Sequence, residues 1–291
     1  MRRWGDAAFV SARHVSEHPE LWLPGALAWI AGAGWIPFIA AVVRPPTVAE
    51  LTFLGAGIIT SGSWPWNAVA IGAATFGIAL LAFGLVAAGN ATLLALLSRR
   101  RPSDIDLVRL LAVGAVVALP IAAAVPVLLV SLVEVVPGEF NAADSPGGPV
   151  LRSIARVAPL LAVAGGIVIL ATSLAMVAGA LAVHGRLGPM VSIRAAPRAL
   201  ARIGGPAVAQ VAISAVTHII YLGFAILLLG VFWAPIGARL GGAGGFDVAI
   251  GLLLVGFVAI WLCLVLAGGA LHAWSAATWS RLLVIDASEG T

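Results

Sequence analysis

A stripe of polar residues interrupts an otherwise apolar segment in the second half of the chain. Its members recur at intervals of three or four residues and are Gln210, Ser214, Thr217, His218 and Tyr221. On an α-helix this spacing places the side chains on one face. An imidazole exchanges protons near neutral pH, and an ionisable side chain is costly in the middle of a bilayer. The stripe therefore predicts either a substrate or proton path, or a neutral histidine that bonds across helices to stabilise a bundle.

Three more polar residues lie near the ends of other apolar segments. Asn90, His184 and His272 each fall in the third of a segment that we assign to the cytoplasmic side. Together with Gln210 they are candidates to converge on one vestibule open to the cytoplasm. The alternative is that polar side chains are simply inexpensive near the membrane interface.

Sites for metals and cofactors are not indicated by the sequence. The five histidines, His14, His18, His184, His218 and His272, show no ligand-type spacing apart from the first two. The single cysteine, Cys263, lies in an apolar run, and neither a phosphate-binding loop nor a nucleophile elbow occurs. We therefore predict no cofactor, no metal and no enzymatic activity.

A basic pattern precedes the polar stripe. Arg194, Arg198 and Arg202 recur at intervals of four residues, and the apolar residues Ile193, Ala196, Leu200 and Ile203 fall on the opposite face of a helix. Such a helix is expected to lie along the inner membrane surface. Its basic face either attracts anionic lipid headgroups or docks an acidic cytoplasmic partner protein.

The amino-acid composition indicates whether lipid or water surrounds the elements that carry these residues. The chain has 291 residues, of which 62% are hydrophobic and 10% charged, whereas soluble domains have about 25% charged residues. The net charge is only +4, and the basic residues flank apolar segments, so nucleic acid is not expected as a partner. All 16 basic residues are arginine, which we interpret as the composition of a GC-rich bacterium. The prediction is an all-α protein of the bacterial cytoplasmic (inner) membrane.

Six apolar segments are long enough to cross a bilayer, which requires about 20 residues. The predicted spans are residues 21–43, 67–97, 106–136, 158–184, 207–233 and 248–274. Residues 48–63 are too short to cross and predict an interfacial or re-entrant segment. Residues 137–150 predict a polar loop, and the residues from Arg281 onward predict a short polar tail.

Arginine counts predict the orientation. With the N-terminus in the cytoplasm, twelve arginines fall on the inner side and four on the outer side, the latter being Arg44, Arg152, Arg156 and Arg239. Cytoplasmic loops retain basic residues. Both termini are therefore expected in the cytoplasm.

An Ala-Gly string recurs at a nearly constant period. Gly89, Gly179 and Gly268 each follow an alanine and lie 90 and 89 residues apart. This predicts a single transmembrane domain of three hairpin repeats, residues 1–98, 99–185 and 186–280, followed by the tail 281–291. Composition alone is the alternative source of the match, because the chain holds 34 glycines.

The run His18-Pro19-Glu20-Leu21-Trp22 and the Gly- and Ala-rich hairpins that follow resemble a family of bacterial six-helix membrane proteins. These proteins are related to the membrane domain attached to some glycerophosphodiester phosphodiesterases, and the resemblance implies a membrane domain without the catalytic one. The layout is also similar to six-helix permease subunits of ABC exporters, which would imply a separate ATPase partner. The function expected is a membrane-embedded transporter subunit, with a scaffold or accessory subunit of a larger complex and an ABC-exporter-like permease as alternatives.

Overall fold

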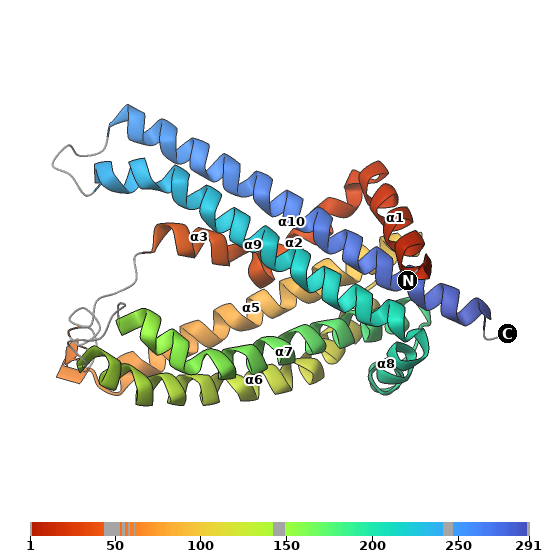
Figure 1. The fold of residues 1–291 in the computed structure, drawn as a ribbon, viewed down its shortest axis with the longest axis horizontal. Helices are drawn as coiled ribbons and strands as arrows, with labels where there is room; N and C mark the ends of the chain where they lie inside the picture. The colour runs from red at the N-terminus through yellow and green to blue at the C-terminus, as the bar shows by residue number, and fades with distance from the viewer. Residues whose placement is uncertain are drawn as a thin grey trace. The chain divides into compact units, whose positions relative to one another are not determined.

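Helices account for every regular element in the part of the chain that the structure describes. The computed structural model describes residues 2–43, 53, 56, 57, 59, 60, 62–141, 149–240 and 247–289. In chain order the elements are α1 (Arg2–Glu17), the 3₁₀ turn η1 (Pro19–Leu21), α2 (Trp22–Trp29), the π-helical turn η2 (Ile30–Gly34), α3 (Trp35–Val42), α5 (Trp66–Leu97), α6 (Asp104–Asn141), α7 (Pro149–His184), α8 (Pro189–Ile203), α9 (Gly205–Leu240) and α10 (Val248–Glu289) (Figure 1). The all-α prediction is confirmed.

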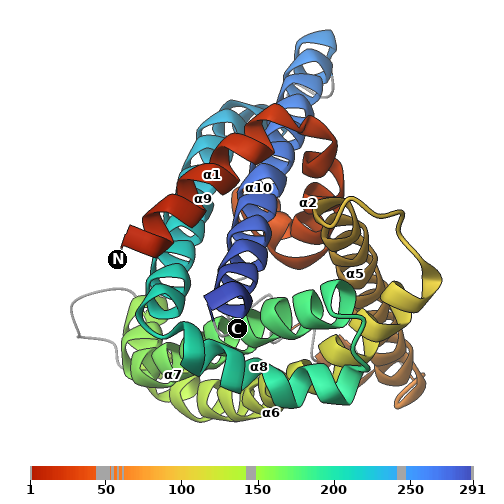
Figure 2. The same cartoon turned by 90° about the vertical axis from the view of Figure 1, so that its right-hand side faces the viewer.

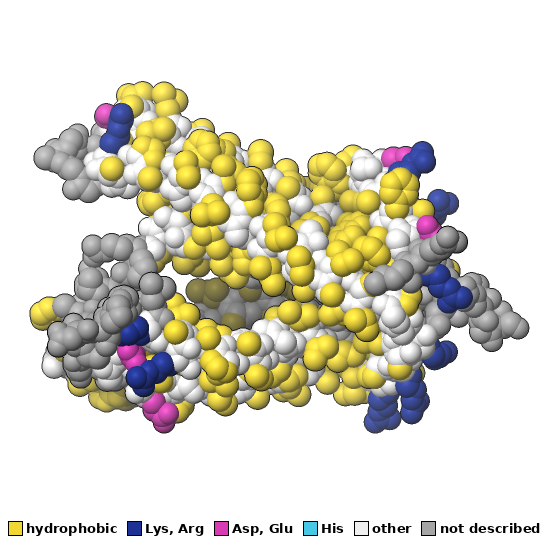
Figure 3. Space-filling view, in the orientation of Figure 1, with side chains coloured by type: hydrophobic (Ala, Val, Ile, Leu, Met, Phe, Trp, Pro, Cys, Tyr) yellow, Lys and Arg dark blue, Asp and Glu magenta, His cyan; other side chains and the backbone are white. Residues whose placement is uncertain are grey.

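Among the residues that the structure describes, six helical segments are long and apolar enough to cross a membrane. They are Pro19–Val42, Trp66–Leu97, Asp104–Val136, Arg152–His184, Gly205–Leu240 and Val248–Val284. Large apolar side chains along these helices are exposed, and the charged side chains gather near the helix ends (Figure 3). A protein folded in water would bury such a surface. The prediction of a multi-pass membrane protein with six spans is confirmed.

Two predicted boundaries are wrong. The predicted loop 137–150 begins inside α6, which continues to Asn141, and α7 already begins at Pro149. The residues after Arg281 are helical to Glu289 rather than a polar tail, because Leu282 continues the apolar face and is buried. The predicted re-entrant segment 48–63 lies mostly outside the described residues.

The chain divides into two compact units that are not consecutive in sequence. Unit 1 comprises Met1–Gly5, Ser103–Ala215 and Trp279–Thr291, and unit 2 comprises Asp6–Pro102 and Val216–Thr278. Helices α9 and α10 each contribute to both units. The organisation as one domain of three hairpin repeats stays a prediction.

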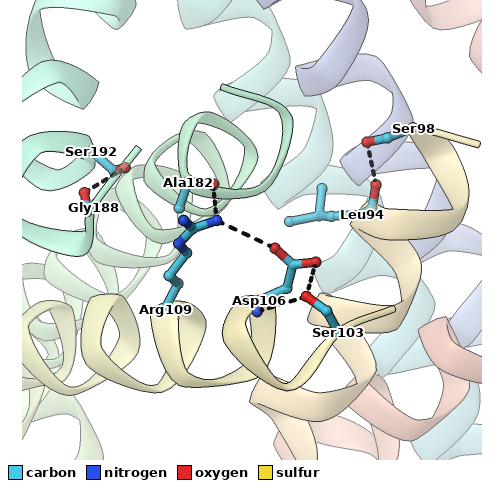
Figure 4. A network of polar contacts seen from close by, with 8 residues as sticks. All are labelled: Leu94, Ser98, Ser103, Asp106, Arg109, Ala182, Gly188 and Ser192. Carbon is cyan, nitrogen blue, oxygen red and sulfur yellow. Dashed lines mark hydrogen bonds and ion pairs between the residues drawn. The ribbon is translucent and has the colours of Figure 1, made fainter. Parts of the chain in front are cut away.

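In unit 1, α6 and α7 form an antiparallel pair (Figure 1). Polar contacts join the two helices at both ends of the pair. At the start of α6, Ser103 caps the helix: its hydroxyl accepts a hydrogen bond from the Asp106 amide at 3.3 Å and donates to the Asp106 carboxylate at 2.8 Å. The buried Asp106 lies 3.6 Å from Arg109, which also donates to the carbonyl of Ala182 on α7 at 3.4 Å (Figure 4). The first turn of α6 is therefore held against the last turn of α7.

The opposite end of the pair is held by one buried carboxylate and two arginines. Glu139 on α6 is 4% exposed. Arg152 on α7 donates from Nε to the carboxylate at 2.9 Å and from Nη2 to the backbone carbonyl of Glu139 at 2.7 Å, while Arg156 pairs with the other carboxylate oxygen. The second of these bonds satisfies a carbonyl in the final turn of α6. This contact explains why the helix extends into the predicted loop.

Neutralising Glu139 is expected to destabilise unit 1. In Glu139→Gln the two arginines keep their positions but lose the charge that compensates them. Removing one partner of a fully buried pair costs about 3–5 kcal/mol, and we expect about 2 kcal/mol here because Arg156 can turn into water. Its side chain is already 70% exposed. Thermal unfolding in detergent, followed by circular dichroism, measures the loss.

Glu134→Gln is the matched control, because Glu134 lies on the same helix and is exposed. An exposed substitution of this kind is expected to change stability by less than about 0.5 kcal/mol. Equal unfolding temperatures for the two variants would show that the carboxylate of Glu139 does not hold the pair together.

Unit 2 has an aromatic and aliphatic core where α3, α9 and α10 meet. Leu229 and Phe257 are fully buried in it, and Phe38, Trp233 and Trp261 pack against them. The rings of Phe38 and Phe257 are 5.7 Å apart, and those of Trp233 and Phe257 are 5.2 Å apart. Packing in this core fixes the positions of α3, α9 and α10 relative to one another. It thereby also positions the polar residues farther along these helices.

The first span contains a one-turn π-helix rather than a continuous α-helix. The wide turn Ile30–Gly34 separates α2 from α3 and contains Gly32 and Gly34. The indole of Trp261 on α10 donates to the carbonyl of Gly34 at 3.3 Å. Single π-turns interrupt the regular hydrogen-bond ladder and occur frequently at functional sites. The turn directly follows Trp29, which belongs to the candidate site described next.

Candidate functional site

The site in unit 2 depends on an unusually close approach of three helix backbones. A methyl group added at Gly25 on α2 would lie 2.3 Å from the carbonyl oxygen of Gly269 on α10. One added at Gly89 on α5 would lie 2.7 Å from the carbonyl oxygen of Pro24. Only glycine fits at such distances, and small residues allow membrane helices to pack this closely. Helices α5 and α10 are thus both drawn against α2.

Asn90 directly follows Gly89 on α5, and its side chain meets that of His272 on α10. Nε2 of His272 donates to Oδ1 of Asn90 at 2.8 Å, which requires Nε2 to carry the hydrogen. Both side chains are partly buried. The bond joins α5 to α10, next to Gly89 on α5 and three residues after Gly269 on α10.

Helix α9 contributes two further polar side chains. The ring of His218 lies 5.5 Å from that of Trp29, and the ring of Tyr221 lies 5.7 Å from Trp29 in an edge-on arrangement. The hydroxyl of Tyr221 donates to the carbonyl of Leu264 on α10. Trp29 is buried and fills the space beside Gly268, where a methyl group would lie 2.4 Å from the indole nitrogen.

His218 on α9 packs against Trp29, and His272 on α10 lies four residues after Gly268, which contacts the same indole. We call His218, His272, Asn90, Tyr221 and Trp29 the polar cluster. Its members come from α2, α5, α9 and α10, and each lies within a segment long and apolar enough to span a membrane. Two groups that can carry a proton therefore lie on the two helices that border Trp29.

The structure divides the residues of the predicted stripe between the two units. Thr217, His218 and Tyr221 belong to unit 2, whereas Gln210 and Ser214 belong to unit 1. Gln210 is fully buried and accepts a hydrogen bond from the indole of Trp4 at 2.9 Å. The continuous path along all five residues stays a prediction.

The predicted vestibule is divided in the same way. Asn90 and His272 meet in unit 2, as just described. His184 belongs to unit 1, where its Nε2 lies 2.9 Å from the hydroxyl of Ser280. A shared vestibule with His184 and Gln210 therefore also stays a prediction.

Trp29 and the π-turn beside it were not among the predicted site residues. Their signal in the sequence is weak: two tryptophans, Trp29 and Trp35, flank a Gly- and Ala-rich run. Within the described residues, no group of three or more His, Cys, Asp or Glu side chains could hold a metal ion.

The fold and the polar cluster define the class of protein: an all-α, multi-pass membrane protein with polar residues bonded between its apolar helices. Comparison of the chain with protein-family models, with curated proteins and with solved structures found no match.

Proposed function

We propose that this protein is a membrane-embedded transporter subunit of a bacterial inner membrane, with both termini in the cytoplasm, and that protons move through its polar cluster. The observation that carries the proposal is the placement of two imidazoles, His218 and His272, on the two membrane-spanning helices that contact Trp29. Ionisable residues within spans face the protein interior or a cavity and commonly mark ion and proton pathways.

The chemistry of the cluster suits proton transfer. Histidine is the side chain whose unperturbed protonation equilibrium lies nearest neutral pH. The amide of Asn90 fixes the tautomer of His272 through its hydrogen bond to Nε2 and leaves Nδ1 to accept a proton.

Proton uptake into proteoliposomes tests the proposal. The purified full-length chain is reconstituted into vesicles that contain a pH-sensitive dye, and a potassium diffusion potential set with valinomycin drives protons inward. Vesicles with the protein are expected to acidify faster than protein-free vesicles. Equal rates would contradict proton movement through this chain.

A scaffold role is the second candidate, and one observation favours it. The hydrogen bonds from His272 to Asn90 and from Tyr221 to Leu264 each join two helices, and such bonds can serve only to stabilise the helix bundle. Hydrogen bonds between membrane helices contribute about 0.6 kcal/mol on average. A scaffold predicts no proton uptake above the protein-free rate and a stable protein partner after purification in mild detergent, identified by mass spectrometry.

A further inference from the structure

Helix α8 is tied to a membrane surface by its position in the chain. One span ends at His184 and the next begins at Gly205, and the fifteen residues of α8 lie between them. Gly204 has a positive φ of 63°, which favours glycine, at the turn into α9. The ends of two adjacent spans therefore hold α8 at the surface of the bilayer.

The two faces of α8 differ in burial. Ser192, Ala196 and Ala199 are buried, and α8 packs beside α7 and α6 (Figure 2). Arg194, Arg198 and Arg202 are exposed and lie on the opposite face. Helix α8 therefore packs on α7 and α6 through one face and exposes three guanidinium groups on the other.

Met190 and Val191, in the first turn of α8, add an apolar element to the exposed surface. They are 57% and 56% exposed. A helix that combines a basic face with exposed apolar residues binds at the boundary between lipid headgroups and acyl chains.

The basic face has no acidic neighbour along the chain. No Asp or Glu occurs between residues 145 and 246, so α8 and the spans on either side of it contain none. Within the described part of the chain, no ion pair involves any of the three arginines of α8. Their charge is therefore available to an external anion.

We infer that this face of α8 is a binding site for the phosphate groups of anionic phospholipids in the leaflet on which it lies. A guanidinium presents paired N–H donors that match a phosphate. Since the ends of the neighbouring spans hold the helix at the headgroup layer, lipid phosphates surround it without any further binding step. An acidic protein would have to reach the same layer and compete with them. The inference does not depend on the proposed transport role.

Native mass spectrometry of the full-length protein, with phosphatidylglycerol or phosphatidylcholine added in detergent, tests this site. The wild-type protein is expected to retain phosphatidylglycerol in preference to phosphatidylcholine. Each basic residue near a membrane surface contributes about a fivefold change in binding constant, so Arg198→Gln is expected to weaken the preference about fivefold. Arg198→Lys keeps the charge and is expected to retain most of it.

Arg239→Gln is the matched control, because Arg239 is also exposed but lies in the last turn of α9, far along that helix from α8. It is expected to leave the preference unchanged. Equal retention of the two lipids by the wild-type protein, or equal effects of Arg198→Gln and Arg239→Gln, would overturn the inference. An acidic protein that co-purifies through the three arginines of α8, without any lipid preference, would also overturn it and assign the face to a protein.

Discussion

Gly269→Ala is expected to destabilise unit 2 by about 3 kcal/mol, as overpacking does in a close-packed interior. The added methyl group would lie 2.3 Å from the backbone nitrogen of Ala26 and 2.6 Å from its Cα. Both atoms belong to the backbone of α2, so that no side chain can rotate away and the two helices must separate. Because α2 carries Trp29, the same separation would also displace the polar cluster.

Gly256→Ala gives the control for this prediction on the same helix. A methyl group at Gly256 would meet no atom within 4 Å. Its effect on stability is expected to be neutral or slightly favourable, since alanine suits a helix better than glycine. Unfolding in detergent, followed by tryptophan fluorescence, compares the two variants. If both unfold at the same temperature, α2 and α10 are not in the close contact described.

His218→Leu is expected to have the largest effect on function. Leucine keeps an apolar side chain of similar bulk beside Trp29 but cannot carry a proton. If protons pass through the polar cluster, their movement should fall at least about tenfold, since no other mid-span group on α9 substitutes for an imidazole. Stability is expected to fall by about 1 kcal/mol, because leucine replaces neither the ring contact of His218 with Trp29 nor its other interactions.

The six spans could be predicted because lipid imposes a simple rule. A segment that crosses the hydrocarbon layer must satisfy its own backbone hydrogen bonds and be apolar over its whole length. Both conditions can be recognised from one segment of sequence. The ends of the helices do not obey this rule: the end of α6 is polar in composition, and it is helical because Arg152 on another helix reaches Glu139.

The candidate site was predictable only in part, for a related reason. Helical spacing showed that His218 and Tyr221 share a face, but not that Trp29 would lie against both. That contact depends on glycines in α2, α5 and α10, whose partners cannot be found from a single sequence. The structure also shows a hydrogen bond between Asn90 and His272, two residues 182 positions apart.

The proton-uptake rate of His218→Leu, relative to wild type in matched proteoliposomes, decides whether protons pass through the polar cluster. Ile219→Leu is the control, because Ile219 is exposed beside His218 on the same helix and lies outside the polar stripe. The unfolding temperature of each variant confirms that it is folded. We expect wild-type uptake in Ile219→Leu and uptake near the protein-free rate in His218→Leu. Uptake by a folded His218→Leu protein at the wild-type rate would contradict a proton path through the polar cluster.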